Sequence, residues 1–139
     1  MRVMVDTNVV LDVLLERQPF ARAATAVFSL IELAHIEGVL CATTITTVDY
    51  LLTQTMPRSA ARHTLRQLLE LFDVAPVTRA VLEAALKSRL ADFEDAVLEE
   101  SGRLAGATVI ITRNQQDFQL STLKVLGPDE LLASLPRPL

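Results

Sequence analysis

The sequence contains few residues that form cross-links or bind soft metals. It has one cysteine, Cys41, and two histidines, His35 and His63. A single cysteine excludes an internal disulfide and a cysteine-based zinc cluster, and two histidines are too few for a multi-histidine metal site. With no tryptophan and one tyrosine, an aromatic platform for stacking nucleic-acid bases is not expected.

Long hydrophobic runs are also missing. The apolar segment at the N-terminus is interrupted at Asp6, which is too early for the core of a signal peptide. No stretch approaches the ~20 apolar residues that span a bilayer. We therefore expect a soluble, cytoplasmic protein that has no membrane partner.

Size and composition favour one domain, residues 1–139, with a well-filled core. Hydrophobic residues make up 50% of the 139 positions and charged residues 22%, which argues against disorder. Thirteen basic and seventeen acidic side chains give a net charge of −4. This balance disfavours a protein whose whole surface binds nucleic acid, but it is compatible with a local basic patch.

Short apolar segments alternate with stretches of helical periodicity. Strands are expected at residues 2–5, 39–42, 74–77, 108–111 and 124–126, although Pro76 disfavours the third. Helices are expected at residues 9–16, 20–34, 43–52, 58–72, 79–90 and 93–105, and a short one is expected from Pro128. Apolar runs without strict alternation are typical of strands buried on both faces. The sequence therefore predicts a three-layer α/β/α sandwich with a mainly parallel central sheet.

Four carboxylates accompany the predicted strand ends and helix starts. Asp6 follows the first strand and Asp117 follows the strand at 108–111. Asp49 and Asp95 lie near the starts of helices that approach the same edge, where ligands bind in sheets of this class. Four such carboxylates would repel one another unless a cation neutralised them, and Mg²⁺ or Mn²⁺ prefers oxygen ligands.

Each of these acids also has an ordinary structural interpretation. Asp6 fits a helix cap, and Asp92 fits the N-cap of the helix at 93–105 because Asp95 follows it at the spacing of a capping box. Asp95 would also complement the helix dipole, and Asp117 is a common turn residue. Asp49 is more informative, because an unpaired carboxylate beside Val48 would be costly if buried.

Asp12, four residues after Asn8, is expected to be a solvated side chain of the first helix.

Three stretches, in this order, resemble the PIN-domain ribonucleases. They are Val5–Asp12 (VDTNVVLD), the segment from Phe93-Glu94-Asp95-Ala96 to Gly106, and Ile110–Phe118 (IITRNQQDF). The resemblance implies that Asp6, Asp95 and Asp117 bind a metal. It also implies a supporting shell of Thr7, Asn8, Asp92, Thr112 and Asn114. The family usually carries Glu on the helix after the second strand, and here Asp49 occupies the matching position, one methylene shorter.

Small single-domain members of this family are commonly VapC-type toxins, which this chain resembles in length. That resemblance implies a Mg²⁺- or Mn²⁺-dependent endoribonuclease that hydrolyses RNA phosphodiester bonds, with Asp6, Asp49, Asp95 and Asp117 as its catalytic acids. It further implies two partners, an antitoxin and a second copy of the chain in a homodimer. One alternative is a PIN-like module that binds RNA or a partner without catalysis, which the Asp at position 49 favours. A phosphoryl-transfer domain of the haloacid-dehalogenase or receiver kind ranks below both, because Asn8 stands where the former needs an Asp.

Arginines supply the candidates for RNA binding. Arg58, Arg62 and Arg66 recur at every fourth position and predict a basic stripe on one helix. The alternative is that they pair with Glu70 and other acids, or only solvate the helix. Arg113, between Thr112 and Asn114, lies nearer the expected metal and is the better single candidate.

Overall fold

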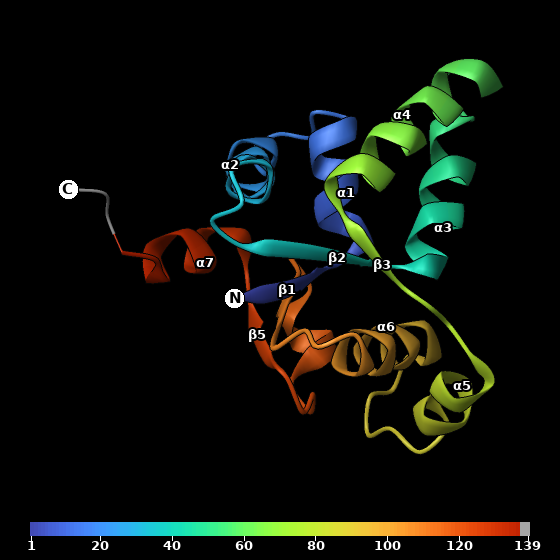
Figure 1. The fold of residues 1–139 in the computed structure, drawn as a ribbon, viewed down its shortest axis with the longest axis vertical. Helices are drawn as coiled ribbons and strands as arrows, with labels where there is room; N and C mark the ends of the chain where they lie inside the picture. Colours follow the sequence, from blue (N-terminus) through green and yellow to red (C-terminus); the bar gives the residue numbers. More distant parts are fainter. Residues whose placement is uncertain (137–139) are drawn as a thin grey trace.

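The computed structural model describes residues 1–136 and has a five-stranded sheet at its centre (Figure 1). In space the strands follow the order β3 (Asp73–Ala75), β2 (Glu37–Cys41), β1 (Arg2–Val5), β4 (Val109–Ile111) and β5 (Lys124–Leu126). Every neighbouring pair is parallel. The predicted fold class is therefore confirmed.

Helices cover both faces of the sheet, as Figure 1 shows. One face carries α1 (Thr7–Leu14), α2 (Ala21–Glu32), α3 (Ala42–Leu52), α4 (Arg58–Leu71) and α7 (Pro128–Ser134). The other face carries α5 (Arg79–Ala85), α6 (Phe93–Leu104) and the 3₁₀ turn η1 (Gln115–Phe118).

The central strand shows why the apolar runs lack strict alternation. Val3 and Val5 pack into one apolar cluster and Met4 into the other, and all three are fully buried. Met4 is in register with Val39 of β2 and with Ile110 of β4, so each neighbour adds an apolar side chain to the same layer. Burial on both faces selects apolar residues at consecutive positions.

All but one of the element boundaries agree with the predicted ones to within two residues, and three of the differences are informative. Helix α1 begins at Thr7 because Asp6 caps it. Strand β3 ends at Ala75, directly before Pro76, which has no backbone N–H for a sheet ladder. Helix α5 ends at Ala85, five residues earlier than predicted, and the turn that follows it is bonded from the Leu90 N–H to the Ser88 hydroxyl.

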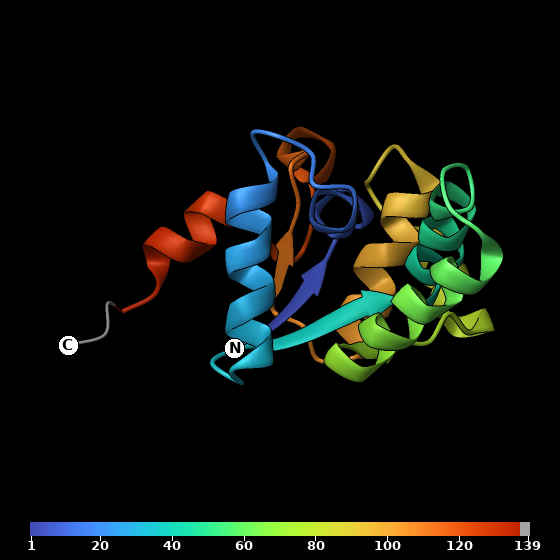
Figure 2. The same ribbon diagram turned by 90° about the horizontal axis from the view of Figure 1, so that it is seen from above.

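The parallel arrangement brings several chain segments to one edge of the sheet. The backbone N–H of Asp6, just after β1, donates to the carbonyl of Ile111 at the end of β4 over 2.9 Å. Figure 2 shows the view from above, in which α2 and α4 lie on either side of α1.

No helix among residues 1–136 is long and apolar enough to cross a membrane.

Candidate active site

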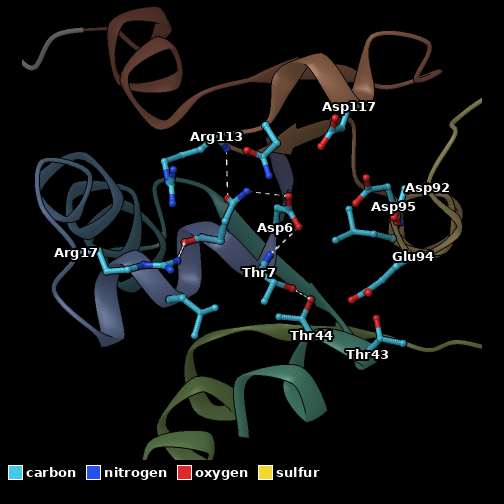
Figure 3. Close-up of a pocket in the computed structure, with 14 residues that line it drawn as sticks. Asp6, Thr7, Arg17, Thr43, Thr44, Asp92, Glu94, Asp95, Arg113 and Asp117 are labelled. Atoms are coloured by element: carbon cyan, nitrogen blue, oxygen red, sulfur yellow. Dashed lines mark hydrogen bonds between the residues drawn. The ribbon is translucent and has the colours of Figure 1, made fainter. Parts of the chain in front are cut away.

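A cavity of about 400 Å³ lies at the carboxyl edge of the sheet, and its charges are separated (Figure 3). Five acids line it: Asp6, Asp92, Glu94, Asp95 and Asp117. Two arginines, Arg17 and Arg113, line the opposite end, and Figure 3 shows Asp6 between the two groups. The cavity therefore has an acidic end and a basic end.

Asp6 is both a helix cap and a lining residue of this cavity. Its Oδ1 accepts a hydrogen bond from the backbone N–H of Thr7 over 2.8 Å, and its Oδ2 accepts from the Thr112 hydroxyl over 2.7 Å. Burial raises the pKa of Asp6, while the bonds from Thr112 and Thr7 act in the opposite direction. The charges of Glu94 and Asp117 raise it further. The cap and metal-ligand interpretations are thus compatible at this residue.

Asp95 lies in the first turn of α6 and has the most perturbed carboxyl group of the cavity. Burial, followed by the charges of Asp6, Asp92 and Asp117, raises the pKa of Asp95 to about 7. Asp92 is the N-cap of α6, as predicted, because its Oδ1 accepts from the backbone N–H of Asp95 over 2.9 Å. The reciprocal bond of a capping box is not formed in the described part of the chain, so the Asp95 carboxylate is not committed to the cap.

The segment after β4 supplies Asp117 and the residues that orient Asp6. Asp117 lies on η1, and its carboxylate extends to the cavity rim (Figure 3). Thr112 is fully buried, and its hydroxyl accepts from the backbone N–H of Asn114 over 3.0 Å while it donates to Asp6. Asn8 Nδ2 lies 3.3 Å from both Asp6 Oδ2 and the Thr112 hydroxyl. Thr112 therefore lies behind the cavity wall as a support for Asp6.

Helix α3 contacts the cavity through residues that sequence reasoning missed. Thr43 and Thr44 line it, and the Thr44 and Thr7 hydroxyls are 2.9 Å apart. Their position directly after a predicted strand was the available signal, because polar residues at strand ends reach this edge. Asp49, further along α3, does not line the cavity, and its Oδ1 is buried without a hydrogen-bond partner in the described structure.

The prediction that Asp12 is solvated is wrong. Its side chain is fully buried. Oδ1 accepts from Arg17 Nε over 2.9 Å, and Oδ2 accepts from Arg113 Nε over 2.5 Å. Arg17 lies in the turn after α1, and Arg113 lies just after β4. Their N–H groups donate the hydrogen bonds that water would otherwise donate to this carboxylate.

The predicted basic stripe lies away from this cavity. Arg58, Arg62 and Arg66 are exposed on α4, and none of them lines the cavity. Within residues 1–136, none of the three forms an ion pair with Glu70 or another acid.

The chemistry of the cavity fits a hard divalent cation. Its acidic end offers carboxylate and hydroxyl oxygens, which are the donors that Mg²⁺ and Mn²⁺ prefer, and the described residues that line the cavity include no histidine or cysteine. The raised pKa values of Asp6 and Asp95 reflect burial and mutual repulsion that a cation would relieve. No three acids among the described residues are already grouped as ligands of one ion, so the side chains would have to converge on it.

Comparison with known proteins identifies the family. Residues 2–116 match the family model described as "PIN domain". The match spans most of the chain, and the chain therefore belongs to the PIN domain family. This confirms the resemblance to the PIN-domain family, and the matched range contains Asp6 and Asp95 and ends one residue before Asp117. None of the curated proteins compared with the chain matches it in sequence.

Solved structures with the same fold include one described as a toxin–antitoxin complex and two described as VapBC. A toxin–antitoxin complex from Klebsiella pneumoniae is 20% identical, with a TM-score of 0.68 over 91% of this chain and 97% of that one. VapBC-1 from nontypeable Haemophilus influenzae is 17% identical, with a TM-score of 0.69 over 93% and 99%. VapBC2 from Rickettsia felis, bound to a DNA fragment from its promoter, is 12% identical, with a TM-score of 0.68 over 91% and 98%. At these identities the likeness concerns the fold.

Proposed function

We propose that this chain is a divalent-cation-dependent endoribonuclease and the toxin of a toxin–antitoxin pair. The observation that carries the proposal is the cluster of carboxylates at the carboxyl edge of the sheet, with the pKa of Asp95 raised to about 7. Like charges held this close to one another are costly, and a bound cation gives them a function.

Asp6, Asp95 and Asp117 are the residues that would hold Mg²⁺ or Mn²⁺. Once bound, the cation would supply an activated water and would neutralise charge on a phosphoryl oxygen. The chain itself orients the ligands. The Thr112 hydroxyl and the Thr7 N–H hold both oxygens of Asp6, and Asp92 caps α6 so that the Asp95 side chain remains available. Asn114 supports the same arrangement through its bond to Thr112.

Asp49 is proposed as the fourth catalytic acid on the strength of its position in the family pattern. It does not line the cavity, and one of its oxygens is buried without a partner. A buried carboxylate oxygen without a donor is unusual in a purely structural residue. Its role is therefore best tested by substitution, as described in the Discussion.

The toxin assignment is supported by the fold and by the extent of the similarity. The chain covers those solved structures almost completely, at 97% to 99% of their length. We propose that the partners are an antitoxin, a second copy of the chain in a homodimer, and RNA as the substrate, and that the protein acts in the cytoplasm.

The second candidate is a PIN domain that binds RNA or a protein without cleaving it. The observation that favours it is the shorter Asp49 in place of the usual Glu. Retention of Asp6, Asp95 and Asp117 in one cavity opposes it.

Cleavage of a mixed RNA pool separates the two candidates. The parent protein should produce discrete fragments with Mg²⁺ or Mn²⁺ and none in EDTA. Asp6→Asn should abolish cleavage while the protein stays folded, because Asn is also a good N-cap. Asp129→Asn, the same change at an exposed position on α7, serves as the control. RNA binding by the parent without any cleavage would favour the binding module.

A further inference from the structure

The basic end of the cavity is formed by an ion triad in which two arginines share one buried carboxylate. Asp12 is fully buried, whereas the side chains of Arg17 and Arg113 are 39% and 27% exposed. One carboxylate cannot neutralise two guanidinium groups, so a positive charge is left over. The exposed parts of both arginines line the cavity on the side opposite the acids (Figure 3).

Both guanidinium groups are held in fixed positions. Arg17 donates through Nε to Asp12 and through Nη2 to the carbonyl of Asn8 over 3.1 Å. Arg113 donates to both oxygens of Asp12 through Nε and Nη2, and its Cζ lies 3.8 Å from the centre of the Phe20 ring. Each guanidinium has five N–H donors, so both retain donors that these contacts do not use. A guanidinium that is already immobilised loses little entropy when it binds an anion.

A simple structural ion pair does not account for this arrangement. A single arginine with good geometry would satisfy a buried carboxylate. Here a second arginine from a different segment adds charge without adding a partner acid, and both cations face the cavity. The positive charge that Asp12 leaves uncompensated at this end of the cavity would attract an anion.

We propose that Arg17 and Arg113 form a phosphate-binding subsite for the RNA backbone, with Asp12 as the residue that positions them. The subsite would hold the phosphodiester next to the one at the acidic end, so the cavity would take two successive phosphates. This inference rests on the proposed function, since it takes RNA as the substrate. It assigns phosphate binding to Arg17 and a positioning role to Asp12, and it makes Arg113 the second arginine of the same subsite.

The salt dependence of RNA binding tests the subsite without any cleavage. The probe is a fluorescein-labelled single-stranded RNA oligonucleotide of mixed sequence, titrated in EDTA at several NaCl concentrations. Each phosphate contact releases a condensed counterion, so the negative slope of log affinity against log salt should become shallower by ~0.7 in Arg17→Gln and in Arg113→Gln. Arg79→Gln is the matched control, because Arg79 is exposed on α5 and its one ion pair within residues 1–136 is with Glu83. Its slope should equal that of the parent.

Arg17→Gln is the variant that keeps the test valid if the triad matters for folding. It leaves Asp12 bonded twice to Arg113, and thermal unfolding of the variant checks that it is folded. A folded Arg17→Gln protein with the parent's slope would overturn the proposal. Weaker binding of an oligoglutamate peptide in this variant, with unchanged RNA binding, would also overturn it, because the subsite would then take a protein carboxylate.

Asp12→Asn tests positioning through the sign of its effect. Loss of a negative charge alone should strengthen RNA binding, whereas loss of the arginines' fixed positions should weaken it. We expect RNA affinity to fall several-fold while its dependence on salt does not become shallower, and a rise in affinity would refute the positioning role.

The enzymatic activity is tested separately from the subsite. Arginine-dependent RNA binding without cleavage in Mg²⁺ or Mn²⁺ would refute the proposed function and leave the subsite intact, whereas cleavage with unchanged slopes would do the reverse.

Discussion

Replacing Asp95 with Asn should stabilise the metal-free protein, and the gain should grow with pH. Burial and the neighbouring carboxylates raise the pKa of Asp95 to about 7 from its ordinary value of 3.8. Between these two values the folded state binds more protons than the unfolded state, so the free energy of unfolding falls as pH rises. The loss begins near pH 4 and is complete above pH 7. Asn cannot ionise, so the Asp95→Asn variant does not lose this part of its free energy of unfolding as pH rises.

The size of the effect follows from the same shift. About three pKa units correspond to about 4 kcal/mol as an upper limit. Asp95 is only partly buried, so solvent screening reduces this value, and loss of a favourable charge at the start of α6 subtracts a further ~0.5 kcal/mol. We therefore expect Asp95→Asn to gain ~1–2 kcal/mol at pH 8 in EDTA, or roughly 3–8 °C in Tm for a domain of this size. At pH 4 the gain should be close to zero.

Urea unfolding followed by far-ultraviolet circular dichroism is a suitable assay, because the chain has no tryptophan. Asp129→Asn is the matched control, since Asp129 also lies in the first turn of a helix but is exposed and outside the acidic cavity. It should lose a few tenths of a kcal/mol at pH 8. If Asp95→Asn is no more stable than the parent at pH 8, or if its gain is equal at pH 4 and pH 8, the acidic cluster is not under repulsion. Adding Mg²⁺ should raise the Tm of the parent more than that of the variant.

Substitutions at three other residues test the remaining assignments. Asp12→Asn should lower the free energy of unfolding by ~2–4 kcal/mol in urea, because it removes the buried negative charge between two arginines and replaces one acceptor oxygen with an NH₂ donor; a loss below 0.5 kcal/mol would contradict this. Asp49→Ala should reduce RNA cleavage more than tenfold and Asp49→Glu should retain it, whereas parent-like cleavage by Asp49→Ala would make the residue structural. Arg62→Ala changes the centre of the α4 stripe. If the stripe contacts the RNA backbone, the negative slope of log affinity against log salt should become shallower by ~0.7. An unchanged slope would exclude it.

The features that were predictable from the sequence depend on neighbouring residues. Asp6 caps α1, Asp92 caps α6 and Pro128 opens α7, and each assignment needs only a few adjacent positions. The fold class was predictable for a similar reason, since apolar strands and amphipathic helices that alternate along the chain leave few arrangements other than a covered parallel sheet. The family pattern then selected Asp6, Asp95 and Asp117 as candidates.

Features that depend on long-range contacts were not predictable. The burial of Asp12 was missed because one of its two partners, Arg113, is 101 positions away, and no local pattern reports such a pair. Asp49 matched the family pattern, yet its place on α3 relative to the cavity depends on how α3 packs against α1. The pKa of Asp95 is likewise a property of the assembled site, since Asp6 and Asp117 approach it only when the carboxyl ends of β1 and β4 lie side by side. Local sequence sets the conformation of each segment, whereas burial and the interaction of distant charges exist only after the chain has folded.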